Sequence, residues 1–150
     1  MTEQTGAAPE GYTSVAPWVV TDDTGAFLDF VAQAFDGEEL GRVATEDGAI
    51  GHGEIRVGDT VVLAFDRRAD WPVVPSLLRV FVADADAAFS RALAAGGQVV
   101  TSLSDNAFGQ RGLNAQPVGG FNGLGTSPDT GVRARPVSCI FGIASSSMRV

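Results

Sequence analysis

The stretch VVTDDTGAFLDFVAQAFDG, from Val19 to Gly37, predicts a short strand followed by an amphipathic helix. A strand is expected over Ser14–Val20, where β-branched and aromatic residues gather. An acidic turn then precedes apolar side chains spaced i, i+3, i+4 and i+7, which is the spacing of one helical face. These apolar side chains are Phe27, Phe30, Val31 and Ala34. One face of the helix is therefore expected to be buried.

A second stretch, VFVADADAAFSRALAAGG from Val80 to Gly97, repeats this pattern at an offset of 62 residues. The offset superposes Asp22 on Asp84, and the second helix is expected to begin at an acidic cap, Asp84 or Asp86. The chain is therefore expected to contain one structural unit twice. At this offset the apolar stripe of the second helix is Phe89, Ala92, Leu93 and Gly96.

Three strand-like runs follow the first helix and give the first unit the order β-α-β-β-β. They are Glu39–Thr45, Ala49–Gly58 and Thr60–Asp66, with breaks at Asp47-Gly48 and Gly58-Asp59.

The second unit starts in the same order, but its pattern is lost beyond Gly112. The linker between the units carries two prolines and Trp71. The expected organisation is a flexible leader over residues 1–13, a first unit over 14–66, a linker over 67–76, the start of a second unit over 77–112 and an atypical C-terminal segment over 113–150.

Composition narrows the classes of partner. The net charge is −8 and all ten basic residues are Arg, so a basic stripe that tracks phosphates is not expected. The single cysteine, Cys139, excludes an internal disulfide and fits a reducing compartment. No stretch is apolar over the roughly 18 residues that a membrane span needs. We expect a cytoplasmic protein that binds neither nucleic acid nor membrane.

Four stretches carry a resemblance to a known family. They are APWVVTDDTGAFLDFVAQAFDGEELGR (Ala16–Arg42), HGEIRVGDTVVLAFD (His52–Asp66), LRVFVADADAAFSRALAAGG (Leu78–Gly97) and NAFGQRG (Asn106–Gly112). In order and spacing they resemble the vicinal oxygen chelate superfamily of glyoxalases, bleomycin-resistance proteins and dioxygenases, and within it the PhnB-like branch. The resemblance covers about residues 16–112. It implies an α+β fold of tandem β-α-β-β-β units, with curled mixed sheets and the helices outside.

The resemblance also implies a small-molecule cavity on the concave faces of the sheets, within one chain or across a homodimer. Metal-dependent members hold a divalent ion there, which polarises two neighbouring substrate oxygens. The position matching one ligand His is Arg79, which cannot bind a cation, and the first strand offers Val15 or a neighbour. Asp66 alone matches as a ligand. We therefore expect no metal and no cofactor, with a metal-dependent lyase, isomerase or dioxygenase as the alternative.

His52 is the only histidine of the chain. Strand alternation places it on one face with Glu54 and Arg56, and Gly51, Gly53 and Ile55 on the other. An imidazole there could exchange protons near neutral pH, or it could be a structural hydrogen-bonding group beside a carboxylate. The structural interpretation is favoured.

Arg79 is the stronger candidate for ligand binding. It alternates with Leu77 and Phe81, the set that the resemblance turns toward the cavity, while Leu78, Val80 and Val82 suit the helix side. The guanidinium needs either an anionic ligand or an internal ion pair with Asp66 or Glu54. Further candidates to line the same pocket are Trp18, Trp71, Phe81, Phe108 and Arg111. The sequence therefore predicts a protein that binds a small molecule without a metal. In one alternative this molecule is anionic.

The segment from Leu113 to Val150 differs in composition from the rest of the chain. Asp129 is its only acidic residue, against seventeen before it. Codons for Val118–Thr126, read in a shifted frame, can encode a Trp-Trp-Val peptide like the one the PhnB-like branch carries on its last strand. A frameshift near Gly112 is therefore one hypothesis, and it would make the chain a non-functional member. The second sheet would then lack its closing strand, and PVSCIFGIA (Pro136–Ala144) would at best add an improvised one.

Overall fold

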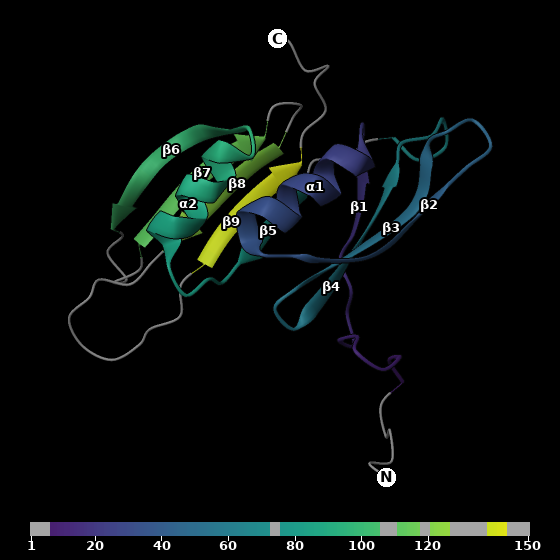
Figure 1. The fold of residues 1–150 in the computed structure, drawn as a ribbon, viewed down its shortest axis with the longest axis horizontal. Coiled ribbons are helices and arrows are strands. Elements are labelled where there is room, and N and C mark those ends of the chain that lie inside the picture. The colour runs from purple at the N-terminus through teal and green to yellow at the C-terminus, as the bar shows by residue number, and fades with distance from the viewer. Residues whose placement is uncertain (1–6, 73–75, 106–110, 118–120, 127–137, 144–150) are drawn as a thin grey trace.

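The computed structural model describes residues 7–72, 76–105, 111–117, 121–126 and 138–143, with the backbone alone at residue 77 and from residue 98 onward. It has two sheets and two helices (Figure 1). The first sheet has the order β1-β4-β3-β2 and consists of β1 (Trp18–Thr21), β2 (Glu38–Ala44), β3 (Ile50–Val57) and β4 (Thr60–Asp66), with α1 (Thr24–Phe35) after β1.

The second sheet follows the same element order and adds one strand. Its members are β5 (Ser76–Val80), β6 (Gly97–Asp105), β7 (Arg111–Pro117), β8 (Phe121–Thr126) and β9 (Ser138–Ile143), with α2 (Ala85–Ala94) after β5. Both sheets contain parallel and antiparallel pairs, which confirms the predicted α+β fold of tandem units with mixed sheets. No helix among the described residues is both long and apolar enough to cross a bilayer.

Helix α1 begins and ends where its capping residues dictate. The Asp23 side chain accepts a hydrogen bond from the backbone N–H of Ala26 at 2.8 Å, which satisfies one amide of the first turn. The helix ends at Asp36, whose φ of 54° lies in the left-handed region. The predicted stripe of Phe27, Phe30, Val31 and Ala34 is buried.

Of the predicted apolar stripe of α2, Ala92 is buried as expected, but the rest of the stripe is out of phase by one residue. The N-caps Asp23 and Asp84 are 61 residues apart, so the repeat has an offset of 61 rather than 62. This offset superposes the buried Phe27 on the buried Ala88. Leu93, expected inside, is 41% exposed. The N-cap determines which face of the helix is buried. Small alanines rather than the larger apolar residues face the interior, namely Ala85, Ala88 and Ala92.

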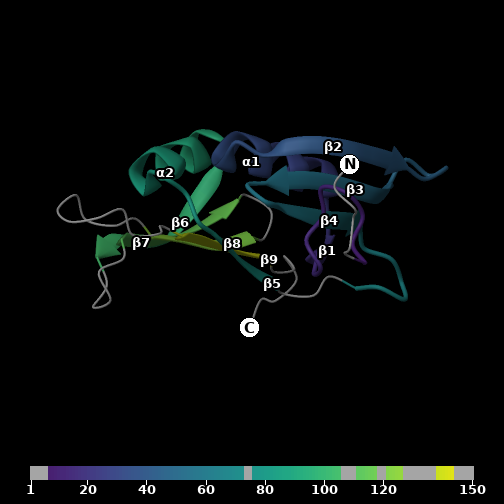
Figure 2. The same cartoon turned by 90° about the horizontal axis from the view of Figure 1, so that it is seen from below.

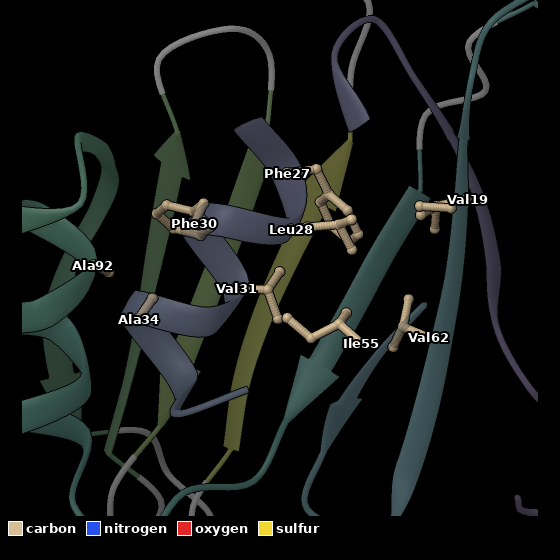
Figure 3. Packing of buried hydrophobic residues seen from close by; sticks show 10 residues of the cluster. Val19, Phe27, Leu28, Phe30, Val31, Ala34, Ile55, Val62 and Ala92 are labelled. Atoms are coloured by element: carbon tan, nitrogen blue, oxygen red, sulfur yellow. The ribbon is translucent and has the colours of Figure 1, made fainter. Parts of the chain in front are cut away.

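The two helices join the two halves of the chain. They lie next to each other in both views (Figures 1 and 2). Ala92 of α2 belongs to the same core cluster as Phe30 and Ala34 of α1 (Figure 3). Arg91 adds an ion pair to Asp36 at 3.0 Å and a hydrogen bond from its Nε to the carbonyl of Ala34 at 3.3 Å. The small side chains allow this close approach of the helices.

The C-terminal part of the second sheet differs from the prediction. Strands were not expected between residue 113 and the run that contains Cys139, yet β7 and β8 pair antiparallel there. Strand β9 lies between β5 and β8 and is antiparallel to both, whereas β4 lies parallel beside β1 in the first sheet. Pairing with neighbours on both sides can impose a strand on a Gly-rich sequence such as β8, because strand preference depends strongly on context.

Candidate functional site

One face of the first sheet packs under α1, and the other, called here the inner face, carries the candidate polar residues. Ile55 is fully buried, and a Cβ atom at Gly53 would lie 2.9 Å from the Cδ1 atom of Leu28 in α1. His52 and Glu54 alternate with these residues and therefore point to the inner face. The predicted alternation of this strand is confirmed.

Aromatic side chains cover part of the inner face. The ring of Phe65 lies edge-on to Trp18, with centroids 5.6 Å apart, and to Trp71, at 6.1 Å. The guanidinium of Arg68 lies 5.3 Å from the centroid of the same Phe65 ring. Trp18 is 60% exposed and Trp71 57% exposed, so both present large apolar surface to the outside. Two exposed tryptophans that contact the same buried ring are typical of a binding surface.

A polar network lies beside this aromatic cluster. Glu54 accepts a short hydrogen bond from the hydroxyl of Tyr12 through Oε2, and its Oε1 lies 2.6 Å from Nε2 of His52. The ring of Trp18 meets the His52 ring edge-on, with centroids 6.3 Å apart. Both carboxylate oxygens of Glu54 are therefore engaged, and His52 is held in one orientation.

The network shifts the pKa values of two of its members. The hydrogen bond from Tyr12, and next the contact with His52, lower the pKa of Glu54. The hydrogen bond to Glu54 raises the pKa of Tyr12, because it favours the neutral phenol. The stabilisation linked to Glu54 is present above its ordinary pKa and is lost as the pH falls through the lowered one. The stabilisation linked to Tyr12 is present below its ordinary pKa and is lost as the pH rises through the raised one.

Tyr12 is the only tyrosine of the chain, so a phenolate titration by ultraviolet absorbance reports on it alone. We expect its midpoint to lie above the ordinary value of 10.0 in the folded protein. The substitution Glu54→Gln should move the midpoint back toward that value, because the neutral amide no longer opposes the phenolate. An unchanged midpoint in Glu54→Gln would contradict the contact.

Asp66 has a structural position rather than a free carboxylate. Its Oδ1 accepts a hydrogen bond from the backbone N–H of Thr24 at 2.7 Å, and its Oδ2 accepts one from Ile50 at 2.6 Å. The carboxylate thus ties the start of α1 to the start of β3. Asp66 and Glu54 are the two partners considered for an ion pair with Arg79. Both carboxylate oxygens of each residue already have another contact.

A divalent-metal centre of the implied kind does not fit these residues. Asp66 uses both oxygens on backbone amides, and Arg79, at the position that matches a ligand His, is a cation. Within the described ranges, no three His, Cys, Asp or Glu side chains gather closely enough to hold an ion.

Arg79 and Phe81 line a separate groove between the two halves of the chain, called here the junction groove. Its volume is about 340 Å³. The guanidinium of Arg79 lies 5.3 Å from the centroid of the Phe81 ring. As predicted for β5, Leu78 and Val80 pack against the core, and they also line this groove. The other lining residues are Pro17 before β1, Val57, Gly58, Asp59 and Thr60 around the β3–β4 turn, and Val62.

The predicted site residues therefore divide into groups. Trp18, His52 and Glu54 meet on the inner face, with Trp71 beside them. Arg79 and Phe81 share the junction groove, and Asp66 belongs to neither. Phe108 lies outside the described residues, and Arg111 is described only as the first backbone position of β7.

Sequence reasoning missed Tyr12 and Phe65. Phe65 could have been found from its alternation with Leu63 along β4. Tyr12 could not be predicted, because it lies in the expected leader and its contact with Glu54 spans 42 residues.

Comparison with known proteins gives a consistent result. The family model of the Glyoxalase/Bleomycin resistance protein/Dioxygenase superfamily matches residues 12–121. An uncharacterised protein of Mycobacterium bovis is 39% identical over 124 residues, which cover 75% of this chain and 82% of that protein. A protein of Mycobacterium tuberculosis is also 39% identical over 124 residues, covering 75% of this chain and 73% of that protein.

Two solved structures are similar in fold. TioX from Micromonospora sp. ML1 has a TM-score of 0.56 at 22% identity, covering 71% of this chain and 90% of that chain. The PhnB protein from Bacillus cereus has a TM-score of 0.53 at 14% identity, covering 69% of this chain and 90% of that chain.

Proposed function

Because the chain belongs to the Glyoxalase/Bleomycin resistance protein/Dioxygenase superfamily, we propose that it binds a small, largely apolar molecule with an anionic group, without a metal. The observation that carries this proposal is the junction groove, which combines apolar walls with the guanidinium of Arg79. Its volume of about 340 Å³ falls at the lower end of the range of small-molecule sites.

The walls of the groove separate apolar from polar contacts. The aliphatic side chains of Val57, Val62, Leu78 and Val80 would bury the apolar part of a ligand. Arg79, held over the Phe81 ring, would bind a carboxylate, sulfonate or phosphate through charge-assisted hydrogen bonds. Asp59 lines the turn side of the groove, so the anionic group is expected at the Phe81 end.

The substitution Arg79→Leu is expected to weaken binding of the fluorescent anion 8-anilinonaphthalene-1-sulfonate about 10- to 100-fold, the effect of losing one charged hydrogen-bond partner. Stability should change little, because Arg79 is an exposed residue. Fluorescence titration and a thermal melt measure the two effects. Arg56→Leu, on the inner face, is the matched control and should retain binding. Equal affinity in wild type and Arg79→Leu would refute the anchor.

The competing function, a metal-dependent enzyme, is disfavoured by the donor chemistry of Asp66 and Arg79. Asp66 would have to give up two backbone hydrogen bonds to ligate an ion, which would leave both amides unsatisfied. Elemental analysis of protein purified without chelator tests this alternative, and about one bound transition-metal ion per chain would favour it.

We also infer that a second copy of the chain covers the inner face and completes a cavity there. Trp18 and Trp71 supply the exposed apolar surface for such contact. Pairing through the edge strand β2 is less favourable, because β2 carries charged side chains and two register shifts, which oppose strand addition.

Sedimentation equilibrium is therefore expected to give a mass of two 15.5 kDa chains. The substitution Trp18→Glu should shift the equilibrium toward the single chain, because it places a charge in the apolar contact. The substitution Glu39→Arg, in the same edge strand but on the helix side of the sheet opposite Ile55, should leave it unchanged. A single-chain mass for wild type at high micromolar concentration would contradict the dimer.

The C-terminal segment carries a separate prediction. The superfamily match ends at residue 121, and β9 lies antiparallel beside β5, where β4 lies parallel beside β1 in the first sheet. The match continues past Gly112, which counts against a frameshift at that residue, whereas the direction of the strand beside β5 supports a frameshift in the segment that follows. A frameshifted chain would be a non-functional member. Sequencing the gene tests it, since an uninterrupted frame shared with intact relatives would exclude it.

A further inference from the structure

The polar network of the inner face has the geometry of an oriented base. Nε2 of His52 lies 2.6 Å from the Glu54 carboxylate, and in the described part of the chain Nδ1 makes no hydrogen bond. The His52 side chain is 40% exposed, so part of its ring is open to a molecule lying on the face. The exposed ring of Trp18, edge-on to His52, forms a flat wall beside it.

We propose that His52 is the proton acceptor of a metal-independent acid–base site on the inner face, which acts on planar, weakly acidic small molecules lying against Trp18. The site is distinct from the junction groove, it lies in the cavity that a second copy would complete over the inner face, and it does not depend on a ligand at Arg79.

Each member of the network has a separate part. Glu54 accepts the hydrogen bond from Nε2 and therefore stabilises the positive charge that develops when Nδ1 takes a proton. Tyr12 donates to the other oxygen of Glu54 and holds that carboxylate in place. Trp18 orients a planar ligand by stacking or edge contacts. Tyr12 and Glu54 are thus positioning residues, and His52 is the group that would touch the ligand.

The proposed step balances without a co-reactant. Nδ1 of His52 forms a bond to a proton from a C–H or N–H group of the ligand, and the electron pair of that bond stays on the ligand as a delocalised anion. The imidazolium then returns the proton to a different atom of the same anion. The net reaction is an isomerisation by proton transfer, with neither oxidation nor reduction.

The probe for this site is 5-nitrobenzisoxazole, a planar compound whose ring opens when a base removes its single acidic C–H proton. The N–O bond breaks as the proton leaves, and the product is a coloured cyanophenolate. Wild-type protein is expected to open it about 100-fold faster than free imidazole at the same concentration and pH. The substitution His52→Gln should reduce the rate to the buffer background.

The positioning residues give intermediate effects. Glu54→Gln should lower the rate about tenfold, because an amide stabilises the imidazolium less than a carboxylate does. The rate should recover in Glu54→Asp if the shorter carboxylate still reaches Nε2. The substitution Arg42→Ala, on the exposed β2 strand, is the control and should leave the rate unchanged.

Folding of each variant is checked by its thermal melt, and for His52→Gln by the phenolate titration of Tyr12, which shows whether the Tyr12–Glu54 contact persists. A wild-type rate no higher than that of free imidazole would overturn the proposal. A folded His52→Gln variant with wild-type rate would overturn it equally.

Discussion

Asp66→Ala is expected to lower the free energy of unfolding by about 2–4 kcal/mol, because it leaves two backbone amides without an acceptor at a cost of about 1–3 kcal/mol each. The two amides belong to Thr24, which is fully buried, and to Ile50. One lies at the start of α1 and the other at the start of β3, so the loss loosens the helix and the sheet together. Urea unfolding followed by circular dichroism measures the change.

The matched control is Asp23→Ala, which also removes a carboxylate that accepts a hydrogen bond at the start of α1. Asp23 is exposed and accepts one amide hydrogen bond, so its loss should cost about 1 kcal/mol, the usual effect of an N-cap. Asp66→Asn keeps one acceptor oxygen and should fall between the two. If Asp66→Ala cost no more than Asp23→Ala, Asp66 would not be the bridge described.

Gly53→Val is expected to destabilise the protein by about 1–3 kcal/mol, although valine normally favours a strand. A Cβ atom at this position would lie 2.9 Å from Cδ1 of Leu28 and 3.3 Å from Cγ2 of Thr24, within the interface between β3 and α1. The sheet and helix must separate, or the Leu28 side chain must leave its rotamer. Thermal and urea unfolding measure the cost.

Gly41→Val, in the edge strand β2, is the control for the same chemical change. No atom lies within 4 Å of a Cβ built there, so valine should be neutral or slightly stabilising. A similar loss in both variants would mean that strand preference, rather than packing under α1, determines the effect.

Strand periodicity predicted the inner face well. In β3 the glycine and isoleucine positions had to face the helix if the polar ones were to face outward, and a period of two leaves no other arrangement. The same reasoning separated Arg79 from Leu78 and Val80 in β5, where the apolar pair packs on the core.

The buried face of α2 could not be predicted from its apolar residues alone. The repeat was aligned on Phe27 and Phe89, but the acidic caps place Ala88, not Phe89, at the position of Phe27. A large side chain can be half-buried at the margin of a helix interface while an alanine occupies its centre. Capping residues were therefore the better guide to the register of the repeat.

The contacts that define the candidate site join residues distant in sequence. Tyr12 reaches Glu54, and Asp66 reaches the amide of Thr24, and each contact spans 42 residues. No local pattern predicts such pairs, because they depend on how the leader and β4 are placed by the folded sheet. The sequence therefore indicated which residues share a face, but not which of them already have hydrogen-bond partners.

The placement of the tryptophans has a further consequence for how this protein can be observed. Trp18 and Trp71 are the only two in the chain, and both flank Phe65 on the inner face. Their intrinsic emission therefore originates from this one surface. A molecule or a second chain that covers the inner face should shift the emission to shorter wavelength or quench it. The lining of the junction groove contains no tryptophan. A ligand held there by Arg79 should therefore leave the emission spectrum largely unchanged.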